Sequence, residues 1–149
     1  MICFATSKIT SNSGLVYPVT LKVKANRRCI IRSIEIIELH HQIKLRPWQI
    51  LDMLSAIFPR YVHSHDTQYE VSFGKNPVEN PSMGYHPCLV VKKVGTDIEK
   101  RYRLDHCVEA IWALTINPAH LRAMIYWWRC NRNQYNCPTG EWTIWRNEN

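Results

Sequence analysis

The stretch VTLKVKA at residues 19–25 alternates apolar and polar residues along its whole length. Successive side chains of a β-strand point to opposite faces, so a period of two predicts a strand with one buried face. Residues 15–25 are therefore expected to form this strand. Residues 1–13 before it are polar and irregular. Residues 26–28 after it read as a turn, with a second short strand at residues 29–31.

Two helix signals follow this strand. Ser33 can cap a helix over residues 33–43, although the isoleucines in that segment also suit a strand. Pro47 fits the first position of a second helix, because the N–H that proline lacks would be unpaired there. The apolar stripe of this second helix extends to residues 57–58, and Pro59 ends it.

The middle of the chain is expected to be mainly β-structure. Residues 61–73 are rich in β-branched and aromatic residues and read as a strand. Residues 74–87 contain two glycines and three prolines, which is typical of a long loop. Residues 88–104 read as a hairpin that turns at residues 95–97.

Two further helices are expected near the C-terminus. Asp105 can cap a helix to about residue 114. Asn117 and Pro118 together make a strong helix start, and this helix should run to about residue 132. The buried stripe of this last helix would consist of Leu121, Met124, Ile125 and Trp128.

The element order predicts an α+β fold, with a small antiparallel sheet and two helix pairs of helix-turn-helix type. A winged helix is one version of this arrangement. Residues 1–149 would make a single compact domain, and residues 138–149 a short aromatic tail. Six scattered cysteines lack any CxxC pair, so they read as free thiols that are mostly buried.

The two predicted helix pairs have the same layout around a proline. Residues 38–50 and residues 109–121 each place apolar residues at matching positions when Pro47 is aligned with Pro118. Two helices that cross steeply need such residues in the turn and on the inner face of the second helix. Both segments resemble the helix-turn-helix of many DNA-binding regulators. Two plain helical hairpins without a nucleic-acid role are the alternative.

The resemblance implies that the second helix of each pair exposes contact residues. In the first pair these are Arg46, Trp48, Gln49 and Asp52, although a carboxylate suits phosphates poorly. In the second pair they are His120, Arg122, Tyr126 and Arg129; the last three share one helix face.

The predicted hairpin adds a second basic feature. Its two arms carry Lys92, Lys93, Lys100, Arg101 and Arg103. Beside a helix-turn-helix, such a hairpin could lie on the DNA backbone as a wing. An ordinary edge hairpin that is protected by its charges is the alternative.

Aromatic residues concentrate at the C-terminal end, where five of the six tryptophans lie at or after residue 112. Trp127, Trp142 and Trp145 are candidates for a protein interface, in which tryptophan and arginine are enriched. Interleaved with Arg129, Arg132 and Arg146, the same aromatics could instead stack on unpaired bases. Core packing is the third interpretation.

Charge and hydropathy limit the classes of partner. The net charge is +7, of which residues 1–60 contribute +6, with nine basic and three acidic residues. Such an excess attracts phosphate backbones and acidic proteins. No apolar run approaches the roughly 20 residues that a membrane span needs, and the first 13 residues do not read as a signal peptide. A cytoplasmic location without membrane contact is expected.

Catalysis is not expected from this sequence. It contains no nucleophile elbow, P-loop or dinucleotide-binding glycine pattern. His63 and His65 would share a strand face, and with a third ligand such as His86 they could bind a divalent metal. No paired carboxylates accompany them, so a metal-dependent nuclease is only the third hypothesis, and no cofactor or metal is predicted.

The sequence therefore predicts a regulatory or accessory protein that binds nucleic acid, with double-stranded DNA as the expected partner. The alternative is a protein-interaction module, such as an inhibitor or a loader, that docks through the tryptophan-rich C-terminus. A small chain of this kind would fit a phage or another mobile element, and it could form a homodimer.

Overall fold

The computed structural model describes residues 1–26, 31–43, 45–62, 68–77, 85–103, 117–135 and 141–147. Seven strands and two α-helices lie within these ranges. In chain order they are β1 (Ile2–Thr10), β2 (Val16–Ala25), β3 (Ile31–Leu39), α1 (Pro47–Ile57), β4 (Tyr69–Pro77), β5 (Tyr85–Lys93), β6 (Glu99–Arg103), α3 (Pro118–Asn131) and β7 (Thr143–Asn147). Short 3-10 helices follow α1 at Pro59–Val62 and α3 at Arg132–Tyr135.

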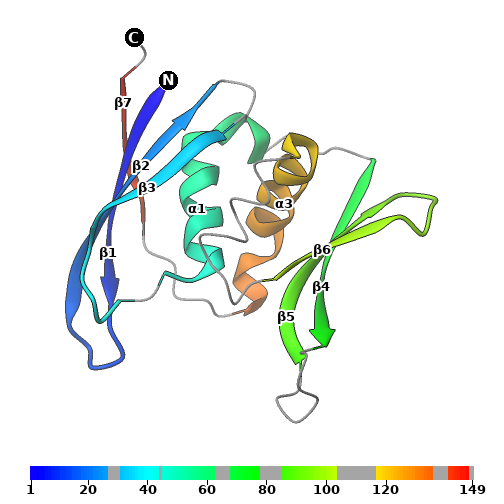
Figure 1. The fold of residues 1–149 in the computed structure, drawn as a ribbon, viewed down its shortest axis with the longest axis horizontal. Coiled ribbons are helices and arrows are strands. Elements are labelled where there is room, and N and C mark those ends of the chain that lie inside the picture. The colour runs from blue at the N-terminus through cyan, green and yellow to red at the C-terminus, as the bar shows by residue number, and fades with distance from the viewer. Residues whose placement is uncertain are drawn as a thin grey trace.

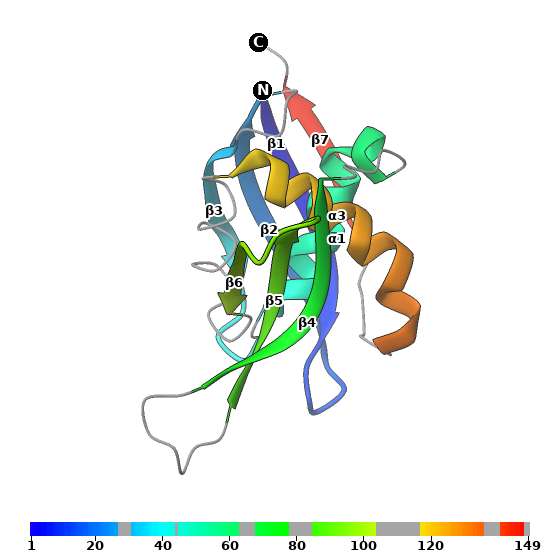
Figure 2. The same ribbon diagram turned by 90° about the vertical axis from the view of Figure 1, so that its right-hand side faces the viewer.

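The strands form two antiparallel sheets with the helices between them (Figure 1). Sheet A has the order β3-β2-β1-β7, and sheet B has the order β4-β5-β6. The helix α1 lies against sheet A, and α3 lies between α1 and sheet B, as the view turned by 90° also shows (Figure 2). The fold is therefore layered as sheet, helix, helix, sheet.

One hydrophobic core runs through these layers. It combines the inner side chains of β1 and β2 with α1, with α3 and with the face of sheet B that α3 covers. Cys3, Ala5, Val19, Leu21 and Val23 are fully buried, and they alternate with residues that face outward. The outer face of sheet A is not covered by any described element.

Several predicted elements are confirmed. The strand at residues 15–25 is β2, the helix that starts at Pro47 is α1, and the hairpin at residues 88–104 is β5 and β6. The last helix begins at Pro118, where the Asn117 side chain accepts a hydrogen bond from the backbone N–H of His120 at 3.3 Å. All four residues of its predicted stripe are buried.

The prediction of two helix pairs is wrong. The segment predicted as a helix at residues 33–43 is mostly β3, so residues 38–50 do not form a helix-turn-helix. The segment predicted as a helix from Asp105 lies outside the described residues. The described residues hold two α-helices and seven strands in two antiparallel sheets, which is not the predicted arrangement of two helix pairs on one small sheet.

Two β-bulges explain why β3 does not show the regular alternation of a strand. The register between β2 and β3 shifts at two points, and each shift leaves one extra residue in β3. The β3 residues opposite buried positions of β2 are therefore spaced by three, two and three, so β3 lacks the strict period of two that identifies a strand from sequence. They are Ile31, Ile34, Ile36 and Leu39. Pairing with β2 and the β-branched isoleucines favour the strand.

Three boundaries also need correction. Residues 1–13 were expected to be irregular, but they contain β1, which pairs with β2 over its whole length. The predicted loop at residues 74–87 is shorter, because β4 continues to Pro77 and β5 begins at Tyr85. The predicted strand at residues 61–73 begins only at Tyr69. Strands β1, β4 and β5 extend into segments predicted as irregular or loop, because cross-strand pairing satisfies their backbone groups.

Candidate functional site

The residues predicted to contact DNA at the start of α1 are held within the fold to different degrees. Gln49 is only 5% exposed, and its Oε1 accepts a hydrogen bond from the backbone N–H of Arg46 at 2.7 Å. Arg46 itself is exposed at the N-cap, and Trp48 is half-buried beside it. Gln49 therefore closes the first turn of α1 and does not present a free side chain to a groove.

Asp52 links the two helices inside the core. Its Oδ1 accepts a hydrogen bond from Nε1 of Trp128 at 2.7 Å and a longer one from Arg132 at 3.4 Å. Burial raises the pKa of Asp52, while the bonds from Trp128 and Arg132 oppose this shift. Above the folded-state pKa of Asp52, its ionised carboxylate therefore lowers the free energy of unfolding. This penalty disappears as the pH falls from the folded-state pKa toward the ordinary value of 3.8.

His120, a predicted contact on α3, is also buried. Its Nδ1 lies 2.7 Å from the hydroxyl of Tyr102 on β6, and its ring meets Tyr69 of β4 edge to face at 4.7 Å. Burial, and then the nearby charge of Lys100, lower the pKa of His120. Burial also raises the pKa of Tyr102 to about 12, which keeps its hydroxyl protonated. The imidazole therefore joins α3 to sheet B in its neutral form.

This arrangement predicts a loss of stability in mild acid. The pKa of His120 is lower in the folded chain than its ordinary 6.5, so the unfolded chain takes up the proton first. The stabilisation is complete above about pH 6.5 and is lost as the pH falls from there through the folded-state pKa. Chemical denaturation between about pH 7.5 and pH 5 should detect this slope. His120→Gln should reduce the slope, whereas His41→Gln, at an exposed position, should leave it unchanged.

The other predicted contacts on α3 are only partly open. Arg122 and Tyr126 are half-buried, and Arg129 is exposed. Tyr126 and Trp127 line a cavity of about 220 Å³ between α3 and β4. The Trp127 ring also packs edge to face on Phe73 at 5.0 Å. Much of this helix face therefore meets sheet B.

The basic residues of the hairpin are divided between the two faces of sheet B. Lys92 lies directly between Glu70 and Glu99 on neighbouring strands, and Arg101 pairs with Glu99 at 3.2 Å. Lys93 and Lys100 lie at positions that share the face of Tyr102, and Lys100 approaches the Tyr102 ring at 5.2 Å. Arg103 belongs to β6, but its side chain is not described.

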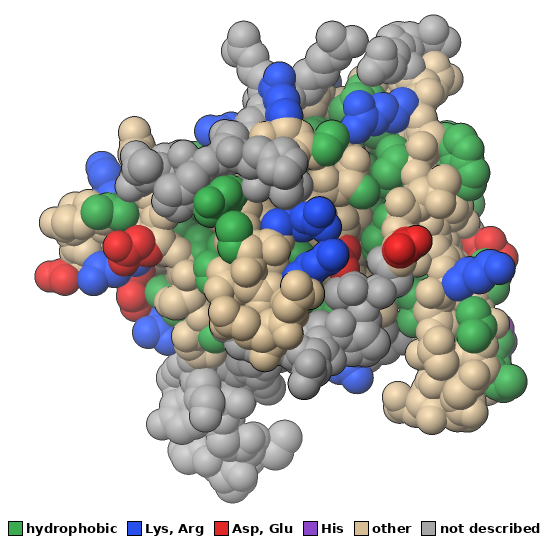
Figure 3. Space-filling model, turned by 180° about the vertical axis from the view of Figure 1, so that it is seen from behind, with side chains coloured by type: hydrophobic (Ala, Val, Ile, Leu, Met, Phe, Trp, Pro, Cys, Tyr) green, Lys and Arg blue, Asp and Glu red, His purple; other side chains and the backbone are tan. Residues whose placement is uncertain are grey.

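The described side chains of the hairpin therefore form no continuous basic field. In the view from behind, Lys and Arg side chains of the described residues are scattered among Asp and Glu side chains (Figure 3). Neutralisation by opposite charges weakens attraction to a phosphate backbone. The wing hypothesis gains no support from this distribution.

The outer face of sheet A carries exposed aromatic residues. Phe4 of β1 lies directly opposite Trp145 of β7 on one side and Lys22 of β2 on the other, and Glu35 of β3 faces Lys22. We call these four residues the aromatic row. Phe4 is 36% exposed and Trp145 is 55% exposed, while the Lys22 ammonium lies 5.9 Å from the Phe4 ring centroid. Directly opposite residues share a face, so both rings stand on the same open surface.

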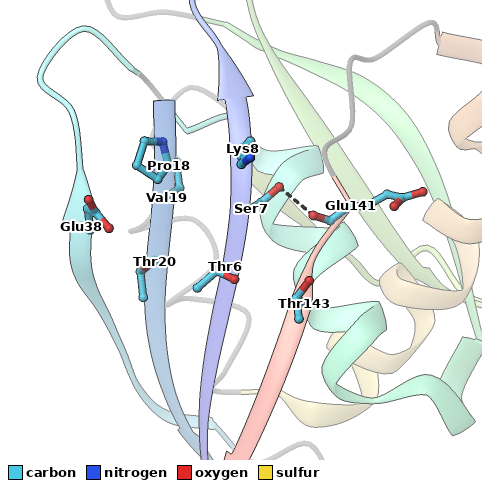
Figure 4. Close-up of a pocket in the computed structure, with 9 residues that line it drawn as sticks. All are labelled: Thr6, Ser7, Lys8, Pro18, Val19, Thr20, Glu38, Glu141 and Thr143. Atoms are coloured by element: carbon cyan, nitrogen blue, oxygen red, sulfur yellow. Dashed lines mark hydrogen bonds between the residues drawn. The ribbon is translucent and has the colours of Figure 1, made fainter. Parts of the chain in front are cut away.

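A second row crosses the same face two residues further along each of β7, β1 and β2. It consists of Thr143, Thr6, Thr20 and Glu38, which we call the threonine row (Figure 4). A hollow of about 670 Å³ lies over this row and is also lined by Lys8 and Pro18. The Ser7 hydroxyl donates to the backbone oxygen of Glu141 at 2.8 Å, which ties β1 to the segment that enters β7.

The described part of the predicted tail contributes the strand β7 to sheet A. Trp145 belongs to β7, whose Arg146 donates to the backbone oxygen of Ile57 at the end of α1. Trp142 is half-buried and packs against the core. Of the three predicted interface tryptophans, only Trp145 is well exposed. Removing residues 138–149 would therefore also remove a strand.

Sequence reasoning missed Phe4 and Lys22 as site residues. The signal was present, because residues 2–9 alternate between small or apolar inner positions and larger outer ones. Ser7 and Ala5 at the inner positions made that pattern look polar and irregular. Its pairing with β7, distant in sequence, had no local signal.

The described residues include no group of three or more His, Cys, Asp or Glu that could hold a metal ion. His63 and His65 lie outside those residues, and the side chain of His86 in β5 is not described. Cys3 and Cys88 are buried free thiols, and Cys130 is an exposed one. Within the same ranges, no helix is long and apolar enough to span a membrane.

Comparison with known proteins gives no relative: no family model, no curated protein and no solved structure matches this chain. The class of the protein is therefore given by its own architecture, an α+β chain whose two antiparallel sheets enclose two helices.

Proposed function

We propose that this chain is a nucleic-acid-binding protein that holds single strands on the outer face of sheet A. The observation that carries the proposal is the aromatic row, which sets two exposed rings side by side on neighbouring strands. Unpaired bases stack on such rings whatever their sequence, because every base has a flat π-face. A flat sheet offers this contact to bases that are already unstacked, whereas a duplex keeps its bases inside.

The charges of the same face fit a phosphate backbone. Lys22 and Lys24 on β2 and Lys8 on β1 stand on the same face as the rings, against Glu35 and Glu38 on β3. The chain as a whole carries a net charge of +7. Basic side chains along a stacking surface are the usual arrangement in proteins that bind single strands. The cytoplasmic location expected from the sequence remains part of this proposal.

Double-stranded DNA is the less suitable ligand. Of the residues expected to read its groove, Gln49 and His120 are buried and bonded within the fold. The exposed rings of Phe4 and Trp145 would find no free base face along a duplex. The proposal therefore moves the interface from the helices to sheet A.

The test is a binding titration of a labelled single strand, followed by fluorescence anisotropy over a series of salt concentrations. The single strand should bind more tightly than the duplex of the same sequence. Affinity should fall with salt by a log–log slope of about −0.7 for each phosphate neutralised. Lys24→Gln should make that slope shallower by about 0.7.

Lys93→Gln is the matched control, since Lys93 is an exposed lysine on sheet B. It should leave both affinity and slope unchanged. If Lys93→Gln weakens binding and Lys24→Gln does not, the hairpin is the interface. No binding of single strands at the lowest salt concentration would refute the proposal outright.

A further inference from the structure

The hollow beside the aromatic row has its own chemistry. Its lining includes the three threonines of the threonine row, the acidic residues Glu38 and Glu141, and Lys8. Glu38, Lys8 and Thr143 are exposed, and Thr6 and Thr20 are half-buried, so all five reach the surface of the sheet. Besides the three threonines, the lining therefore holds two acidic residues, Glu38 and Glu141, and one basic residue, Lys8.

Its position relative to the rings is fixed by the strands. Each of the three threonines lies two residues from a member of the aromatic row on its own strand. The pairs are Thr6 with Phe4, Thr20 with Lys22, and Thr143 with Trp145. Two residues along a strand span about 7 Å, and both rows share a face. A nucleotide whose base stacks on Phe4 or Trp145 would accordingly extend its sugar over the threonine row.

The carboxylate decides which part of the nucleotide suits the hollow. Glu38 repels a phosphate but accepts hydrogen bonds from hydroxyl groups. Threonine hydroxyls donate and accept, which again suits a sugar hydroxyl. Lys8 is the one cation of the hollow and suits the phosphate that follows the sugar.

We infer that the hollow is a ribose subsite, and that the ligand class of this surface is single-stranded RNA. The 2′-hydroxyl is the group that lets a protein distinguish RNA from DNA, and Glu38 with the threonine row is placed to bind it. This inference rests on the proposed function, because the base must stack on the aromatic row for the sugar to reach the hollow.

The experiment compares RNA and DNA single strands of the same sequence, by anisotropy, on the full chain. The unaltered protein should prefer RNA by about tenfold, which corresponds to about 1.4 kcal/mol. Glu38→Ala and Thr20→Val should each bring the ratio of the two affinities toward one. Thr20→Val keeps the β-branched shape that a strand favours, and thermal melting verifies that both variants are folded.

Glu35→Ala is the matched control. Glu35 is an exposed carboxylate on the same strand, but it belongs to the aromatic row and does not line the hollow. Removing either charge lowers the repulsion of both strands equally, so Glu35→Ala should raise both affinities and keep their ratio.

The outcomes separate the two claims. Equal affinity for RNA and DNA overturns the ribose subsite and leaves the single-strand proposal standing. A preference for RNA that survives both Glu38→Ala and Thr20→Val also overturns the assignment of the hollow. Failure to bind either strand overturns the proposed function and this inference together.

Discussion

Replacing Trp128 with alanine is expected to lower the free energy of unfolding by about 3–5 kcal/mol. Trp128 is 1% exposed and is the largest fully buried side chain among the described residues. It lies in α3 and contributes to the contact between α3 and α1 that separates the two sheets. The truncation leaves a cavity in the middle layer and removes the donor to Asp52. Urea denaturation monitored by circular dichroism measures the loss.

Two controls separate packing from the hydrogen bond. Asp52→Asn keeps an acceptor for Trp128 Nε1, so it should cost much less than Trp128→Ala. Trp127→Ala removes the same side chain one residue earlier, where it is half-buried against Phe73. If Trp127→Ala destabilises the chain as much as Trp128→Ala, the core between the two sheets is not the main source of the chain's stability.

Combined replacement of Phe4 and Trp145 with alanine should abolish measurable binding of single strands. Each stacked base contributes about 1–3 kcal/mol, which is about 5- to 150-fold in affinity for each ring. Both rings stand on the open face of sheet A, so the fold should survive their loss. Anisotropy titrations of the two single variants and the double variant measure the effect, with thermal melting as the test of folding.

A conservative and a remote substitution complete this experiment. Phe4→Tyr keeps a flat ring and should retain most of the affinity. Ile98→Ala removes an exposed apolar side chain from the connection between β5 and β6 and should change nothing. A double variant that binds as tightly as the unaltered chain would show that the aromatic row is not the interface.

Local sequence predicted an element correctly where the residues of that element carried both its periodicity and the signals for its ends. The helix α3 has a capping Asn117, a proline at its first position and a complete apolar stripe, and all of these appear in the structure. The strand β2 was equally clear because its alternation is strict. In both cases the periodicity and the end signals agree with the final burial.

Local sequence misled where the partner strand decides the pattern. The bulges against β2 removed the regular alternation from β3, and no residue of β3 itself indicates where they lie. The same limit applies to the site. Trp145 stood out as an aromatic residue, but its neighbour Phe4 could not be identified, because their pairing joins β1 to β7.

The pairing of β1 with β7 also has a consequence for how the chain folds during synthesis. Phe4 pairs with Trp145, so every residue between these two must leave the ribosome before they meet. Until then β1 is an open edge of a β3-β2-β1 sheet, and unpaired edges recruit strands from other chains. Contacts of such long range also slow folding. We expect nascent chains halted before residue 143 to aggregate through β1, and chaperones that shield exposed edges to raise the yield of this protein.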